Sequence, residues 1–185
     1  MALRRGFRTE ANSYAREVRT ELGLALDAPL CPFMTADHLA VPILKLSSFA
    51  TVLPDQTAYL SRTGSGVGFS AMTACFPRQH AIIYNDCLPL TRSHADIMHE
   101  ISHLMLLHPP HRLRADTGGR HYDSDLEDEA NWLGPALLVS EEAALAIAQR
   151  GWSAGQAAKI YNVSPSLMQM RLNVTGAMKR VARAA

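Results

Sequence analysis

The sequence lacks the features that mark several large classes of protein. Its three cysteines, Cys31, Cys75 and Cys87, are widely spaced and form no Cys-x-x-Cys pair. An odd number of isolated cysteines cannot build a full disulfide framework, so we expect reduced, partly buried thiols and a cytoplasmic protein. No apolar run approaches the roughly 18 residues that a membrane span needs. The charged N-terminus has no apolar run behind it, so we expect neither a secretory signal nor a membrane partner.

An excess of positive charge is also missing. Lys and Arg total 18 against 17 Asp and Glu, a formal net charge of +1. This balance argues against a protein that binds nucleic acid mainly through a basic surface, although it leaves room for one local basic patch. Hydrophobic residues make up 48% of the chain, enough for a substantial core, and eight histidines carry the clearest chemical information.

Hydrophobic spacing and turn residues predict an α+β fold, with a small antiparallel sheet and helices around it. Gly23 should end the first helix, and Ser164 followed by Pro165 should start the last one. The basic residues beyond it, Lys179, Arg180 and Arg183, are predicted to lie in a mobile tail. The expected helices cover about 10–22, 36–40, 93–107, 125 onward, 141–150, 153–162 and 165–174, the expected strands 41–46, 69–76 and 81–85, and the expected loops 61–68 and 108–124.

The strongest chemical signal is the sequence His99-Glu-Ile-Ser-His103 inside a predicted helix. A helix advances about 100° per residue, so His99 and His103 project from one face, one turn apart, and can hold one metal ion. Imidazole suits Zn²⁺, which in catalytic sites takes three protein ligands and leaves a fourth position for water. Zinc would lower the pKa of that water to about 7, and Glu100 would take its proton as the general base.

A third ligand is available on the next predicted helix. Glu127 and Asn131 stand at i and i+4 on one face, so one can bind the metal while the other orients a ligand histidine. We predict Glu127 as the ligand, with Asn131 behind it, while Glu129 remains a competitor. An acidic first turn that merely complements the helix dipole is the alternative interpretation.

These residues resemble the ImmA/IrrE family of zinc metallopeptidases. The resemblance rests on the segment His99–His108, on Ile82–Asn85 and Arg92 before it, and on Glu127–Leu133 after it, and it extends over roughly residues 10–175. It implies a zincin-like α+β domain, zinc ligands His99, His103 and Glu127, and Glu100 as the base. The best-known members cleave helix-turn-helix repressors. The expected function is therefore zinc-dependent endopeptidase activity on a protein substrate, such as a transcriptional repressor, through Glu-assisted attack of zinc-bound water.

The sequence departs from the family pattern in two places. Ser102 stands where glycine is usual, a small-for-small change that should be tolerated. Gly134-Pro135 replaces small, helix-favouring residues, and Pro135 should kink or end its helix because it has no N–H to donate to the Asn131 carbonyl. We predict a peptidase core over residues 1–140 and a helical extension over 141–185 packed on it.

Two further features remain open in the sequence. The candidate residues for stabilising the oxyanion of the transition state are His121, Tyr122, Arg120 and Tyr84. Either Phe69–Phe76 or Ala81–Asn85 could present a sheet edge to an extended substrate, or both could be ordinary buried strands. The remaining histidines, at 38, 80, 94, 108 and 111, have no ligand spacing and are predicted to be surface or core residues.

Residues 153–174 support a rival interpretation, because they resemble a helix-turn-helix pair. Its second helix would expose Ser166, Gln169 and Arg171 toward bases. One arginine without a flanking basic run gives little phosphate affinity, so we consider two packed helices completing the peptidase the better interpretation. The alternative function is a regulatory protein- or DNA-binding module whose zinc site is structural or vestigial.

Overall fold

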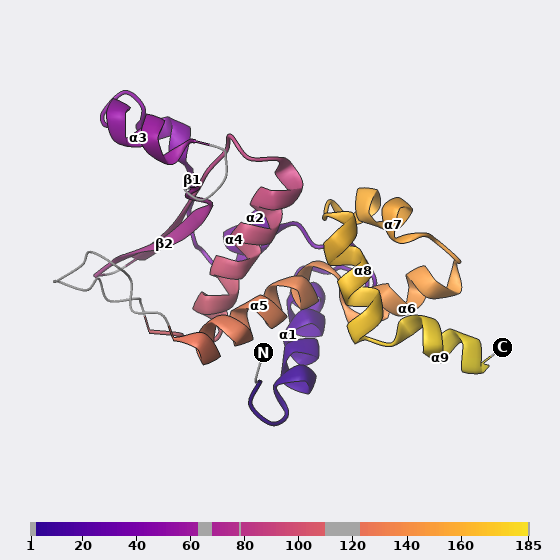
Figure 1. The fold of residues 1–185 in the computed structure, drawn as a ribbon. Coiled ribbons are helices and arrows are strands. Elements are labelled where there is room, and N and C mark those ends of the chain that lie inside the picture. The colour runs from indigo at the N-terminus through magenta and orange to yellow at the C-terminus, as the bar shows by residue number, and fades with distance from the viewer. Residues whose placement is uncertain (1–2, 63–67, 78, 110–122, 185) are drawn as a thin grey trace.

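The computed structural model describes residues 3–62, 68–77, 79–109 and 123–184, and it shows the predicted α+β fold (Figure 1). The sheet lies at one end of the molecule and the helices α6 to α9 lie at the other, with α1, α4 and α5 between them. The predicted loops at 61–68 and 108–124 fall mostly outside the described residues.

The sheet has three strands in the order β1-β3-β2: β1 (Ile43–Lys45), β2 (Ala71–Phe76) and β3 (Gln79–Tyr84). The antiparallel pairing of β2 with β3 confirms the predicted hairpin. β1 pairs parallel to β3, so the sheet is mixed, not antiparallel throughout. Because β3 is central, β2 is an edge strand of the sheet in the described part of the chain.

The helices confirm most of the pattern read from the sequence. They are α1 (Phe7–Glu21), α2 (Pro32–His38), α3 (Pro54–Leu60), α4 (Leu90–Met105), α5 (Ser124–Leu138), α6 (Glu141–Gln149), α7 (Ala154–Tyr161), α8 (Pro165–Val174) and α9 (Ala177–Ala184), with a short 3₁₀ helix at Leu46–Phe49. Gly23 follows the end of α1 at φ +67°, and the Ser164 side chain caps α8 by accepting from the Leu167 N–H. The sequence reasoning did not predict α3. The prediction of a mobile C-terminal tail is wrong, because that segment forms α9.

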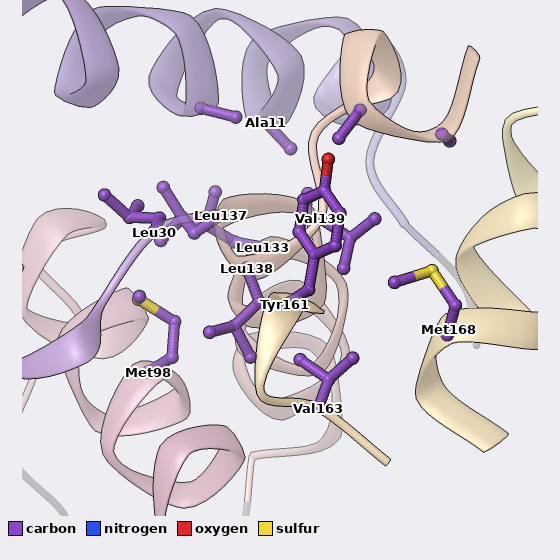
Figure 2. Close-up of a cluster of buried hydrophobic side chains, with 14 of the residues drawn as sticks. Ala11, Leu30, Met98, Leu133, Leu137, Leu138, Val139, Tyr161, Val163 and Met168 are labelled. Atoms are coloured by element: carbon purple, nitrogen blue, oxygen red, sulfur yellow. The ribbon is translucent and has the colours of Figure 1, made fainter. Parts of the chain in front are cut away.

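The centre of the molecule is the contact between α4 and α5. Helix α4 buries Ile97, Met98 and Ile101, and α5 buries Leu133 and Leu137 in the same hydrophobic cluster (Figure 2). The two helices lie close together at Gly134, where an added Cβ would be 3.4 Å from the backbone nitrogen of His99. Burial of these side chains fixes the two helices against each other, and both carry candidate metal ligands.

Pro135 does not end α5, which continues to Leu138. The end of the helix is held by two buried arginines from other helices. Arg19 of α1 donates to the Leu137 carbonyl at 2.8 Å, and Arg171 of α8 donates to the Val139 carbonyl at 2.9 Å. Carbonyl groups at a helix C-terminus have no partner within the helix, so these guanidinium groups satisfy acceptors that would otherwise be buried without one.

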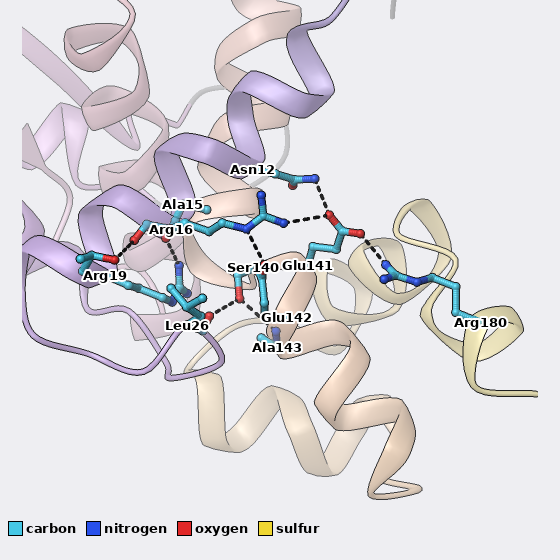
Figure 3. A network of polar contacts seen from close by, with 11 residues as sticks. Asn12, Ala15, Arg16, Arg19, Leu26, Ser140, Glu141, Glu142, Ala143 and Arg180 are labelled. Carbon is cyan, nitrogen blue, oxygen red and sulfur yellow. Dashed lines mark hydrogen bonds and ion pairs between the residues drawn. The ribbon is translucent and has the colours of Figure 1, made fainter. Parts of the chain in front are cut away.

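Residues after 140 pack tightly against the preceding part of the chain. Ser140 caps α6 by accepting from the Ala143 N–H, and its hydroxyl donates to the Leu26 carbonyl (Figure 3). The first turn of α6 carries Glu141, which accepts from Asn12 of α1 at 2.7 Å and also pairs with Arg180 of α9. One hydrophobic cluster includes residues from both sides of position 140. The division into a core and an extension stays a prediction.

One further expectation needs correction. Cys75 and Cys87 are exposed, and only Cys31 is half-buried, so the thiols are less buried than predicted; none forms a disulfide. Cys75 lies on the edge strand β2, and Cys87 lies in the turn before α4. Among the described residues, no helix combines the length and apolarity needed to cross a bilayer.

Candidate metal centre

Helix α4 places His99 and His103 on the side opposite its buried face. Their Nε2 atoms lie 3.1 Å apart, as expected for side chains one turn apart on one face. Ser102, which replaces the usual glycine, is fully buried, and its hydroxyl donates to the Met98 carbonyl at 2.7 Å. The extra oxygen therefore has a partner within the helix and does not disturb the histidine pair.

The third candidate ligand comes from the first turn of α5. The Asp123 side chain caps this helix by accepting from the Asp125 and Leu126 N–H groups. One turn further on, the two carboxylate oxygens of Glu127 lie 3.3 Å from His99 Nε2 and 3.5 Å from His103 Nε2. The carboxylate of Glu129 does not join this group and instead lies 3.3 Å from His108 Nε2. The geometry thus favours Glu127, the ligand predicted from the sequence.

The spacing of these three groups fits a zinc ion. With bonds of about 2.0–2.1 Å and tetrahedral angles, two ligand atoms on one zinc are separated by about 3.3 Å. In the site the two Nε2 atoms are 3.1 Å apart, and each lies close to this value from a different oxygen of the Glu127 carboxylate, at 3.3 Å for His99 and 3.5 Å for His103. Two imidazoles and one carboxylate are a donor set that catalytic zinc sites use, with one coordination position left over. His99, His103 and Glu127 are therefore the residues that could hold the metal.

Glu100 lies beside this group in a cleft of about 1060 Å³. The walls of the cleft are β2 on one side and α4 and α5 on the other. Thr73 of β2 donates from its hydroxyl to Glu100 Oε2 at 2.7 Å. One oxygen of the carboxylate is thus fixed by the strand, which orients the group without adding it to the ligand set. Sequence reasoning did not identify Thr73, because nothing in the sequence indicated which strand residue would face the helix.

A second carboxylate, Asp96, lines the same cleft one turn before His99. Burial raises the pKa of Asp96, and the nearby Arg92 guanidinium, which donates to it at 2.8 Å, partly offsets this effect. Asp96 and Arg92 form an i, i+4 pair on α4, so this part of the wall is polar but locally charge-balanced.

Of the other predicted site residues, one lines the cleft, one does not, and three lie outside the described residues. Asn131 lines the cleft and is exposed, and within the described residues its side chain hydrogen-bonds neither histidine, so its orienting role stays a prediction. Tyr84 is buried against Phe33, with ring centroids 5.8 Å apart, and does not line the cleft. His121, Tyr122 and Arg120 lie outside the described residues.

His108 is a second residue that sequence reasoning missed. Its side chain is only 6% exposed, and its Nδ1 lies 2.9 Å from His103 Nδ1. Helical spacing did not indicate this contact, because His108 follows the end of α4. The signal that could have found it is a histidine just beyond the predicted helix end, where a C-terminal turn folds the chain back on the last helical turn.

The helix pair α7 and α8 does not present the predicted DNA-contacting surface in full. Ser166 and Gln169 are exposed, but Arg171 is 2% exposed because it reaches into the core to the Val139 carbonyl. The expectation that Arg171 could contact bases is therefore wrong. Burial also lowers the pKa of Arg171 to about 10.

The site combines two facing histidines and an adjacent glutamate on one helix with a carboxylate from the next helix. Taken together, these groups define a metallopeptidase-type centre on a zincin-like α+β domain. The family model of the IrrE N-terminal-like domain, Peptidase M78, matches residues 61–173. The chain belongs to this family, and the resemblance noted in the sequence is confirmed. The matched region runs from before β2 into α8 and includes every residue of the candidate centre. No curated protein matches the chain significantly.

Proposed function

We propose that this protein is a zinc-dependent endopeptidase that cleaves a protein substrate. The observation that carries the proposal is the convergence of His99 Nε2, His103 Nε2 and the Glu127 carboxylate to separations of 3.1–3.5 Å at the wall of a large cleft. Family membership supports the same class of activity. A structural zinc usually has four Cys or His ligands and needs no neighbouring carboxylate base, whereas this centre offers three ligands and Glu100.

The chain's own residues have distinct tasks in this proposal. When bound, zinc supplies Lewis acidity toward a carbonyl oxygen and toward water. Glu100 accepts the proton of the attacking water and later returns it to the leaving amine. The hydrogen bond from Thr73 occupies one carboxylate oxygen, Oε2, which directs the other toward the cleft. A positioned general base of this kind contributes about 10²–10⁴ in rate.

The edge strand β2 is the proposed binding site for the substrate backbone. Residues 70–75 line the cleft opposite α4, and among the described residues β2 pairs only with β3, along one of its two sides. An extended peptide can add to such an edge through main-chain hydrogen bonds, which bind many sequences with similar strength. This arrangement favours β2 over β3 among the two strands considered from the sequence, because β3 is paired on both sides.

A helix-turn-helix transcriptional repressor is the proposed substrate, and this part rests on the family resemblance alone. The rival function is a regulatory module that acts by binding. Its sequence basis was the helix pair at 153–174, and the burial of Arg171 removes one of its three candidate contacts.

The deciding experiment is a cleavage assay with Glu100→Gln. The variant keeps the size of the side chain and can still accept from Thr73, but it cannot act as a base. We expect it to fold and bind zinc like the parent, while cleavage of a helix-turn-helix repressor co-expressed with it falls by about 10²–10⁴. A Glu100→Gln protein that binds zinc and still relieves repression as well as the parent would show that proteolysis is not the function.

A further inference from the structure

The candidate ligand His103 is the first member of a chain of polar contacts that runs away from the metal centre. His103 Nδ1 lies 2.9 Å from His108 Nδ1, and His108 Nε2 lies 3.3 Å from Glu129 Oε2. The other Glu129 oxygen accepts from Arg4 Nε at 2.7 Å. The His103, His108 and Glu129 side chains are 12%, 6% and 12% exposed, so water has little access to these contacts.

The contacts allow one consistent arrangement of protons for two neutral rings. Glu129 at the end is an acceptor, so the His108 nitrogen facing it, Nε2, carries the proton. The other His108 nitrogen, Nδ1, then accepts, which places the proton of His103 on Nδ1. In that tautomer the lone pair of His103 is on Nε2, the atom 3.5 Å from Glu127 and 3.1 Å from His99.

The backbone holds His108 in this position. Beyond the end of α4, Leu107 adopts the left-handed conformation at φ +53°, and the His108 N–H donates to the His103 carbonyl at 3.0 Å. This is the turn that usually carries glycine at the left-handed position. Leu107 is 88% exposed, so its side chain gains little packing in return for the strain. The turn brings the two histidines into contact both through the backbone and through their rings.

The last member of this series of contacts, Glu129, is held by the N-terminal segment of the protein. Arg4, which precedes α1, pairs with both Glu129 and Glu10, each at 2.7 Å. A guanidinium on the outer side of the Glu129 carboxylate fixes its orientation toward His108. Glu127 and Glu129 thus have separate tasks, although they stand only two positions apart on α5.

We propose that His108 and Glu129 are positioning residues that hold the His103 ring in the orientation and tautomer required of a metal ligand. The inference rests on the proposed zinc site, and it adds residues outside the His99–His103 motif that support one of the ligands. Ligand histidines usually donate their second N–H to a carboxylate or carbonyl. Here a second histidine is inserted between the ligand and its carboxylate.

The test measures the zinc dissociation constant of the full-length protein by competition with a chromophoric chelator. We expect His108→Leu and Glu129→Gln to weaken zinc binding by about 10–100-fold. His108→Asn should restore part of the loss, because its side-chain oxygen can occupy the place of Nδ1 and accept from His103. In the zinc-free protein, nitrogen NMR of the histidines should show the His103 proton on Nδ1 in the parent, and a population lacking this proton at Nδ1 in His108→Leu.

A matched control pair lies elsewhere on the surface. His38 Nε2 and Glu21 are 2.8 Å apart and exposed, and neither residue lines the cleft, so His38→Leu and Glu21→Gln remove a similar contact and should leave zinc affinity unchanged. Zinc affinity in His108→Leu equal to that in His38→Leu would overturn the proposal. If His108→Leu does not fold, Glu129→Gln decides by the same criterion. Loss of zinc in His103→Ala, measured in parallel, keeps failure of this proposal distinct from failure of the zinc site itself.

Discussion

Replacing Arg19 by methionine removes a charge that the fold buries between α1 and α5. The guanidinium is fully buried and donates to four carbonyl groups, those of Ala28 at 2.9 Å, Ala15 at 3.0 Å, Leu137 at 2.8 Å and Leu138 at 3.4 Å. Hydrogen bonds from a charged donor contribute about 1.5–3 kcal/mol each. Burial opposes them, because it removes the charge from water, and it also lowers the pKa of Arg19 to about 10.

The hydrogen bonds outweigh the burial cost, so Arg19→Met should lower the free energy of unfolding by about 2–5 kcal/mol. Arg16 on the same helix is the matched control: it pairs with Glu142 at 2.5 Å, but its side chain is 43% exposed. Arg16→Met should cost about 1 kcal/mol or less, because exposed ion pairs contribute little. Urea unfolding followed by circular dichroism measures both. Equal losses in the two variants would refute the reasoning.

Three further predictions concern the site and its surroundings. Glu127→Gln should weaken zinc binding at least about ten times more than Glu129→Gln in the chelator assay, because it removes a charged ligand; the reverse ranking would contradict the assignment. Burial lowers the pKa of His94, so the unfolded chain binds more protons than the folded one as the pH falls below about 6.5. His94 should therefore contribute a loss of stability to the zinc-free protein as the pH falls through about 6.5, and His94→Gln should reduce this loss while the exposed His80→Gln should not, both in urea unfolding. Leu107→Gly should raise the free energy of unfolding by about 1 kcal/mol in thermal unfolding, and a destabilised variant would show that the turn is not strained.

Much of the fold follows from local signals in the sequence. Regular apolar spacing predicted α1 and α4, and capping residues such as Ser164 placed the start of α8. Helix α3 gave no such signal, because Thr57 is its only fully buried residue. Helix α9 is short and basic, and it depends on tertiary contacts such as the pair between Arg180 and Glu141. Local patterns do not report contacts of this kind.

The candidate site likewise combines contacts that the sequence predicts with contacts that it does not. The helical period brings His99 and His103 together wherever α4 lies, so sequence alone predicted that pair. The choice between Glu127 and Glu129 depends on how α5 is rotated against α4, which is set by the close approach at Gly134. His108 depends on a left-handed turn at Leu107, a residue type that rarely adopts it. Long-range packing and an uncommon backbone conformation therefore decided what the sequence left open.

The central claim is that His99, His103 and Glu127 bind one zinc ion, and X-ray absorption at the zinc edge tests it most directly. We predict one zinc per chain by elemental analysis, with nitrogen and oxygen neighbours at about 2.0–2.2 Å and two imidazoles in the outer scattering. The His103→Ala variant should lose this metal. Zinc retained in full by His103→Ala, or a sulfur neighbour at about 2.3 Å in the parent, would contradict the account.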